Sequence, residues 1–232
     1  MDKFKQMLKE GRFPLVMSLP RNDPELARIA WENGADVVKV HINVKHHASQ
    51  TLFGSFEEER AAIETMLADA KGPMGIVLGA DCWVAGDALA EAVAHGFDFF
   101  SLYGHHASPS VLAAEGITRM VAPDYTWADW EIESLPEIGV DILEASVMHP
   151  DSYGQPLSGR ELIRYRHLSR LTPLPIVVPT QRAVRPEEVA ALRDCGVSGL
   201  MIGAVVTGKD GESIGRAVAA FRKSIDEMRN RP

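Results

Sequence analysis

The segment Asn33–Asn43, with the sequence NGADVVKVHIN, contains the organising feature of this chain, a joint between the end of a helical pattern and an apolar strand. Glycine at such a joint ends a helix, since it adopts a left-handed backbone without a Cβ clash. The same joint recurs at Gly34-Ala35-Asp36, Gly96-Phe97-Asp98, Gly139-Val140-Asp141 and Gly196-Val197-Ser198, with looser versions at Gly72-Pro73 and Gly116-Ile117-Thr118. This repetition predicts alternating helices and strands along the chain.

Eight short apolar segments are predicted as parallel strands buried on both faces. They are Leu15–Leu19, Val37–Asn43, Gly75–Asp81, Phe99–Tyr103, Arg119–Pro123, Ile142–Val147, Ile176–Thr180 and Gly199–Gly203. Helical patterns lie between them at Asp23–Asn33, Phe56–Lys71, Gly86–His95, Glu161–Leu171, Pro186–Cys195 and Gly211–Met228. We therefore predict a single (β/α)8 TIM barrel over residues 1–232, preceded by a short amphipathic helix within Met1–Pro14. An open doubly wound sheet is the alternative, although no Gly-rich dinucleotide fingerprint follows the first strand.

Composition limits the class of partner. Of the 232 residues 46% are hydrophobic and 24% charged, as in globular proteins, and the net charge of −8 argues against a nucleic-acid surface. The N-terminal residues carry charges among the apolar ones, which predicts neither a signal peptide nor a membrane span. The two cysteines, Cys82 and Cys195, lie far apart without metal-ligand spacing. We predict a cytoplasmic protein without a membrane partner that could form a homo-oligomer.

The last two predicted strands open into loops that suit an anion. In barrel enzymes these loops often hold a phosphate with backbone N–H groups and the start of a short helix. We predict a phosphate site formed by Gln181, Arg182, Gly203, Ala204, Val205 and Thr207. The alternative is that Gly203 and Gly208 only turn the chain between a strand and the last helix.

A family resemblance accompanies this pattern. The run from Pro179-Thr180-Gln181-Arg182 through Pro186-Glu187-Glu188-Val189, followed by Gly199–Thr207, resembles the C-terminal quarter of ribulose-phosphate-binding barrels. It is most similar to N-acetylmannosamine-6-phosphate 2-epimerases and more distantly to thiamine-phosphate synthases. The resemblance implies a phosphorylated, sugar-like ligand. Those epimerases have an acidic residue where this chain has Thr180-Gln181, and a lysine where it has Gly79-Ala80-Asp81, so their reaction is not carried over.

Strand periodicity indicates which side chains face the barrel mouth. Lys39, His41 and Asn43 share one face of their strand, and Glu144 and Ser146 share a face of another. Ionisable groups inside a barrel are costly unless they are paired or used. We predict Lys39 and Glu144, from opposed strands, as the acid/base pair, with Lys39 as base or Schiff-base amine and Glu144 as acid. Asp81 and His41 are the orienting or replacement groups in this prediction.

Other hypotheses for these residues and for the residues around the mouth remain open. Lys39 could form a purely structural ion pair with Asp81 or Glu144. We predict no cofactor, but His41, Asp81, His105 and Glu144 could instead bind zinc or manganese, although no compact motif such as H-E-x-x-H occurs. The loop Val44–Ser55 is a candidate lid, and the aromatic residues of the segment 125–130 suit either the site entrance or a subunit interface.

The functional prediction is an enzyme of carbohydrate metabolism that acts on a small phosphorylated, sugar-like substrate. An isomerase or epimerase that works by acid/base proton transfer is favoured over an aldolase or lyase. A metal-dependent hydrolase or epimerase and a non-catalytic phosphate-ligand sensor are the other hypotheses, because one barrel supports many chemistries.

Overall fold

Eight parallel strands form a closed barrel in the computed structural model, which describes residues 3–230. Around the barrel the strands follow the order β1-β10-β9-β8-β7-β6-β5-β2, and β2 pairs with β1 to close it. Their bounds are β1 (Leu15–Ser18), β2 (Val37–His41), β5 (Met74–Val77), β6 (Phe99–Tyr103), β7 (Thr118–Ala122), β8 (Ile142–Glu144), β9 (Ile176–Pro179) and β10 (Gly199–Ile202). The predicted TIM barrel is confirmed, and the open sheet is wrong.

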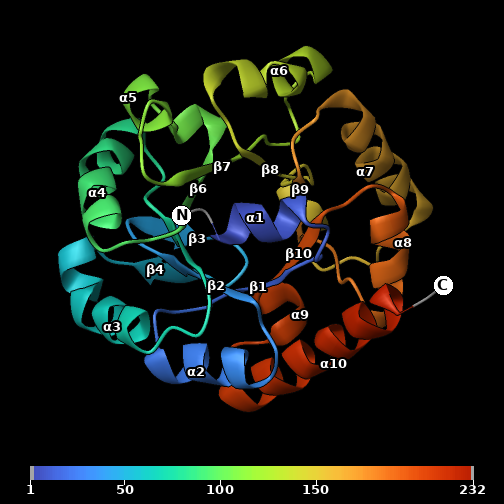
Figure 1. Cartoon of the computed structure of the whole chain (residues 1–232), viewed down its shortest axis with the longest axis horizontal. Coiled ribbons are helices and arrows are strands. Elements are labelled where there is room, and N and C mark those ends of the chain that lie inside the picture. Colours follow the sequence, from blue (N-terminus) through green and yellow to red (C-terminus); the bar gives the residue numbers. More distant parts are fainter. Residues whose placement is uncertain (1–2, 231–232) are drawn as a thin grey trace.

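Helices surround the barrel, as Figure 1 shows. They are α2 (Pro24–Glu32), α3 (Phe56–Ala68), α4 (Cys82–Ala94), α5 (Pro109–Leu112), α6 (Asp129–Glu133), α7 (Gly159–Leu171), α8 (Val189–Asp194), α9 (Ala204–Thr207) and α10 (Gly211–Arg229). Within the described residues, no helix is long and apolar enough to cross a membrane.

The joint glycines behave as the sequence predicts. Gly34, Gly96, Gly139 and Gly196 have φ of 102°, 75°, 87° and 88°, the left-handed region that suits glycine. The aspartate of the joint then ties neighbouring elements together: Asp36 accepts a hydrogen bond from the Leu15 amide. The motif therefore ends the helix and ties the following segment to the neighbouring strand.

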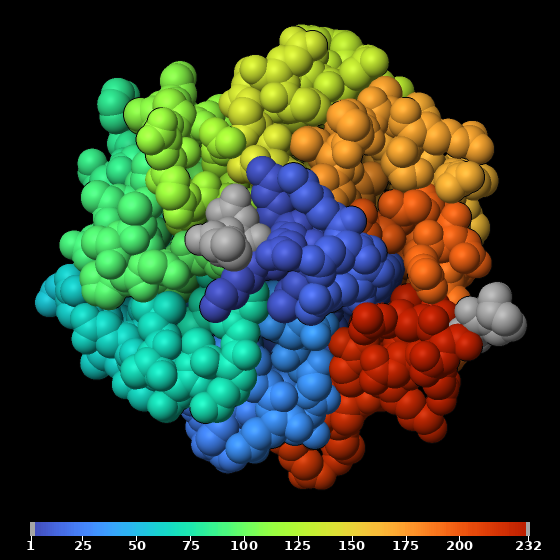
Figure 2. Space-filling model, viewed as in Figure 1, coloured from blue at the N-terminus to red at the C-terminus, as the bar shows by residue number. Residues whose placement is uncertain are grey.

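The predicted N-terminal helix, α1 (Lys3–Lys9), closes the amino end of the barrel. It crosses the middle of the ring in Figure 1, and Figure 2 shows it covering this end of the molecule. Phe4 is fully buried, and its ring centroid lies 4.6 Å from that of Phe99. Gly75 leaves room for the Phe99 ring, since a Cβ at Gly75 would lie 2.0 Å from a ring carbon. Within the described residues, α1 therefore covers the amino end of the barrel.

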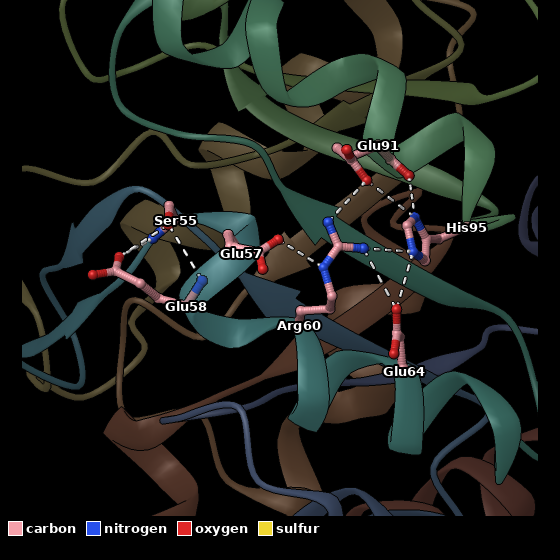
Figure 3. Close-up of polar contacts among 7 residues, drawn as sticks. All are labelled: Ser55, Glu57, Glu58, Arg60, Glu64, Glu91 and His95. Carbon is pink, nitrogen blue, oxygen red and sulfur yellow. Dashed lines mark hydrogen bonds and ion pairs between the residues drawn. The ribbon is translucent and has the colours of Figure 1, made fainter.

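Charged side chains join α3 to α4 on the outside of the barrel. Ser55 and Glu58 form the capping box that begins α3. Figure 3 shows Arg60 of α3 reaching both Glu57 on its own helix and Glu91 on α4, with Nε–Oε2 and Nη2–Oε2 distances of 2.8 and 3.6 Å. Such exposed pairs stabilise only slightly, so they fix helix orientation more than they add stability.

Several elements differ from the sequence prediction: the strand predicted over Ile142–Val147 ends at Glu144, and the one predicted over Val37–Asn43 ends at His41. The strand predicted over Gly75–Asp81 ends at Val77, and α4 begins at Cys82 rather than at Gly86. The cause is Asp81, whose carboxylate accepts hydrogen bonds from the Trp83 and Val84 amides and so caps the helix earlier. The predicted lid loop contains an antiparallel hairpin, β3 (Val44–His46) and β4 (Thr51–Phe53).

Candidate functional site

A cavity of about 270 Å³ opens at the carboxyl ends of the strands, opposite α1. The barrel strands supply its floor and walls, and residues of the β3 segment and the turn that follows it border one side. This is the end of the barrel at which TIM-barrel enzymes carry their active sites. The predicted polar face of β2 therefore reaches a single enclosed space together with residues of the opposite strands.

Lys39 and Glu144 meet on the cavity floor. They come from β2 and β8 on opposite sides of the barrel, and the Lys39 Nζ lies 3.7 Å from the Glu144 Oε2. Both residues are buried, 4% and 7% exposed, and both line the cavity. Ser101 on β6 donates a 2.6 Å hydrogen bond to the same carboxylate oxygen. The carboxylate is thus held in place by a hydroxyl, whereas the ammonium has no hydrogen bond within the described residues.

The other two residues of the acid/base prediction, His41 and Asp81, lie in different places. His41 lines the cavity, two residues beyond Lys39 on the same face of β2. Asn43 was predicted on that face but does not line the cavity; its φ is 54°, and its amide donates to the Leu78 carbonyl. Asp81 caps α4 from an exposed position and does not line the cavity. Of the four predicted residues, the cavity therefore brings together Lys39, Glu144 and His41.

Two histidines in ring contact, with their planes tilted by 43°, form the wall on the hairpin side. The ring centroids of His41 and His46 are 4.5 Å apart, and Phe53 packs 4.8 Å from His41. Burial lowers the pKa of His41 well below its ordinary value, with His46 and Lys39 adding to the effect. Burial, then the charge of Lys39, lowers the pKa of His46 to about 4. Both imidazoles are therefore neutral near pH 7 and can donate or accept a hydrogen bond according to tautomer.

The opposite wall is a hydrogen-bonded group of hydroxyls around Gln181. Its amide nitrogen donates to the Ser146 hydroxyl at 2.9 Å and to the Tyr153 hydroxyl, while its carbonyl accepts from the Met148 amide. The Tyr103 hydroxyl lies 2.9 Å from that of Ser146. Gln181 was predicted as a phosphate ligand, but its side chain is 3% exposed and bonded on both ends to protein.

Arg182 does not line the cavity. Its guanidinium lies 2.7 Å from the buried carboxylate of Glu161 and donates to the Ser152 carbonyl and the Gln155 side chain at 3.0 Å. The charge predicted for a phosphate is therefore used to hold the loop after β8 against α7. Thr207 is likewise buried, and its hydroxyl donates to the Gly208 carbonyl.

The backbone amides that the sequence predicts for a phosphate lie at the start of a short helix. Ala204 and Val205 begin the short helix α9, so their amides have no acceptor within the helix. The Gly203 amide instead donates to the Thr180 hydroxyl at 3.2 Å. Gly203 and Val205 line the cavity. Among the described residues, the Ala204 and Val205 amides thus have no hydrogen-bond acceptor, and of these two residues Val205 lines the cavity.

The alternative metal ligands do not converge. Within residues 3–230, no group of three or more histidine, cysteine or acidic side chains is arranged to hold a metal ion. His105 lies 3.8 Å from Asp124 on the rim, away from Glu144 on the floor. The aromatic residues predicted for the entrance, Tyr125, Trp127 and Trp130, do not line the cavity; Trp130 is 68% exposed on α6.

The sequence prediction placed Ser146 on the inward face of its strand but gave it no role, and it did not single out Ser101. Ser101 and Tyr103 alternate on one face of β6, so strand periodicity contained a signal for Ser101 as well. Tyr153 had no such signal, because it comes from an irregular loop that Gln181 and Arg182 position.

Comparisons with known proteins support the fold. No protein-family model matches the sequence, and no curated protein matches it. Among solved structures, a KGPDC from Streptococcus mutans has a TM-score of 0.70 at 11% identity, covering 94% of this chain and 99% of that one. A thiamine phosphate pyrophosphorylase from Pyrococcus furiosus has 0.66 at 14%, covering 95% and 98%. A tryptophan synthase from M. tuberculosis has 0.69 at 14%, covering 96% of each chain. At 11–14% identity these likenesses show that the chain shares the TIM-barrel fold with these proteins.

Proposed function

We propose that the protein is an isomerase of small phosphorylated, sugar-like substrates. The observation that carries this proposal is the Lys39–Glu144 pair, 3.7 Å apart on the floor of the cavity. The fold neighbour named for a phosphorylated compound, the thiamine phosphate pyrophosphorylase, supports the substrate class by analogy only.

In this proposal the two residues take the reverse of the roles that the sequence prediction gave them, and the ion pair supports this choice. Glu144, fixed by Ser101, acts as the base that removes a proton from the carbon next to the substrate carbonyl. The C–H electron pair forms the C=C bond of an enediolate, and the Lys39 ammonium stabilises the negative charge on the former carbonyl oxygen. A second proton then moves from the adjacent hydroxyl to the former carbonyl oxygen. Glu144 returns the first proton to the neighbouring carbon, which completes the isomerisation.

The position of the pair favours isomerisation over two-base inversion. Inversion at one carbon needs a base and an acid on opposite faces of the substrate. Here both groups lie together beneath the cavity and reach the same face. A single base that moves a proton between adjacent carbons uses this arrangement directly. Of the two activities that the sequence prediction favoured, this arrangement therefore supports an isomerase rather than an epimerase.

The phosphate would lie at the free amides of Ala204 and Val205, with exposed Lys45 of β3 at the cavity border. Backbone amides at a helix start bind phosphate oxygens through oriented N–H groups. A cavity of about 270 Å³ accommodates a small sugar phosphate between these amides and the floor.

The test uses a panel of aldose and ketose phosphates in deuterated water, with solvent exchange at the carbon next to the carbonyl followed by NMR. Glu144→Gln and Lys39→Met are each expected to lower exchange and turnover about a thousandfold. Lys223→Met, at a side chain 78% exposed on α10, is the matched control and should leave both unchanged.

Three results would contradict the proposal. Unchanged turnover in Lys39→Met would remove Lys39 from the mechanism. Trapping of the substrate on Lys39 by borohydride would replace proton transfer with a Schiff-base aldolase or lyase route. Phosphate binding without exchange or turnover across the panel would favour a ligand sensor.

A further inference from the structure

The amide orientation of Gln181 is fixed by its partners. The Met148 backbone nitrogen can only donate, so the side-chain atom that faces it is the carbonyl oxygen of Gln181. The NH2 group then faces the cavity wall. Its two protons are both used, one on the Ser146 hydroxyl and one on the Tyr153 hydroxyl. Both hydroxyl oxygens therefore act as acceptors toward Gln181.

This orientation determines where the hydroxyl protons go. Tyr103, Ser146 and Tyr153 carry one hydroxyl proton each, and Gln181 offers them donors rather than an acceptor. The bond between Tyr103 and Ser146 uses one of the three protons. A hydrogen bond between the Tyr103 and Tyr153 side chains uses a second proton. Within residues 3–230 no further protein acceptor bonds to these hydroxyls, so one proton is left to point into the cavity that all three residues line.

The location of this wall matches the proposed chemistry. Ser146 lies two residues beyond Glu144 on β8, and Tyr103 two residues beyond Ser101 on β6, so the wall stands directly above the floor pair. Burial, then the neighbouring Tyr153, raises the pKa of Tyr103 well above its ordinary value, so its hydroxyl keeps its proton. The donors are thus preorganised near the carbon and oxygen atoms that would react.

We propose that Tyr103, Ser146 and Tyr153, oriented by Gln181, form an oxyanion-binding wall that selects ligands carrying a negatively charged oxygen above the Lys39–Glu144 pair. Gln181 is a positioning residue, because it acts through the two hydroxyls and does not itself face the ligand with a free group. The ligand class is an enediolate-like or carboxylate-like oxygen, as opposed to an alcohol. The inference rests on the proposed function, because the phosphate group of such a ligand is taken from that proposal.

The test compares two probes by titration calorimetry. Phosphoglycolohydroxamate carries a planar, charged oxygen pair that mimics an enediolate, whereas glycerol phosphate carries the same phosphate with alcohols. The natural protein is expected to bind the hydroxamate about ten- to a hundredfold more tightly, the range of one hydrogen bond to a charged group. Equal affinity, or no hydroxamate binding, overturns the inference.

Variants then assign the preference to the wall. In Gln181→Glu the carboxylate can only accept, so it draws the protons of Ser146 and Tyr153 away from the cavity. The hydroxamate preference should disappear, with glycerol phosphate affinity changed less than about twofold. Tyr153→Phe should lower the preference at least about fivefold and tests the idea if Gln181→Glu does not fold. Tyr165→Phe is the matched control, since that hydroxyl is buried, has no hydrogen-bond partner among residues 3–230 and does not line the cavity. An unchanged preference in Tyr153→Phe overturns the inference.

The two proposals can fail separately. If the hydroxamate is preferred but no sugar phosphate is turned over or exchanged, the oxyanion-binding wall is supported and the isomerase proposal fails. If turnover occurs without a hydroxamate preference, the isomerase proposal stands and the wall is refuted.

Discussion

Replacing Arg182 by Met should destabilise the protein without weakening phosphate binding. Residue type and position predicted Arg182 as a phosphate ligand, but its guanidinium is 2.7 Å from Glu161 and bonded to the loop after β8. The Arg182 and Glu161 side chains are only 13% and 5% exposed. Removing the cation would leave the buried carboxylate without its charged partner.

The expected size of the effect follows from this burial. Breaking a buried ion pair by removing one partner costs about 3–5 kcal/mol. For a protein of this size each kcal/mol shifts Tm by about 2–4 °C, so the melting temperature should fall by roughly 6–20 °C. The Ser158 hydroxyl and amide also donate to Glu161, which places the true value nearer the lower end.

Calorimetric melting and phosphate titration on the same samples provide the assay. Arg185→Met is the control, because this neighbouring arginine is 67% exposed and its ion pairs lie on the surface; its Tm should change by less than about 2 °C. Adding Glu161→Gln to Arg182→Met should recover part of the loss, since a neutral amide needs no counter-charge. An unchanged Tm together with tenfold weaker phosphate binding would refute the structural role.

Two further predictions concern packing and pH. Gly75→Ala should lower the free energy of unfolding in urea by about 3 kcal/mol or more, because its Cβ would overlap the Phe99 ring. Gly86→Ala, with nothing within 4 Å of its Cβ, should stabilise α4 by about 0.5–1 kcal/mol. Similar values for both would contradict the close packing of Phe99 on Gly75. The folded-state pKa values of His41 and His46 are depressed, so the unfolded chain binds more protons and stability should fall as pH drops from 6.5 toward 4. His46→Gln should flatten this dependence, and equal stability at pH 7 and 5 in the unsubstituted protein would show that the imidazoles are not buried neutral.

Local sequence patterns were sufficient to predict the fold. The joint of glycine and aspartate appears as a left-handed residue followed by a structural carboxylate, and period-two alternation correctly placed Lys39 and Glu144 inside the barrel. Both features depend only on backbone geometry within a few residues, which is why one sequence reveals them. The early start of α4 was missed because Asp81 serves equally well as a strand-end carboxylate and as a helix cap.

The loops could not be predicted in the same way. The β3–β4 hairpin brings His46 against His41, a contact that depends on how an irregular segment folds back over the barrel. Tyr153 reaches the cavity only because the loop after β8 is held from outside the barrel. Neither arrangement has a periodicity that the sequence could display.

Gln181 and Arg182 show why residue type alone does not identify a ligand. A guanidinium binds a phosphate and a carboxylate through the same N–H groups, and an amide bonds equally to a substrate or to a hydroxyl. In this protein a buried carboxylate on α7 takes the guanidinium, and two wall hydroxyls take the amide. Both residues therefore fix the loop after β8, and through it Tyr153, so one two-residue segment after β9 sets the geometry of the wall. If the wall binds an oxyanion, the stability of the Arg182–Glu161 pair and the selectivity of the cavity are coupled, although the ion pair never contacts the ligand.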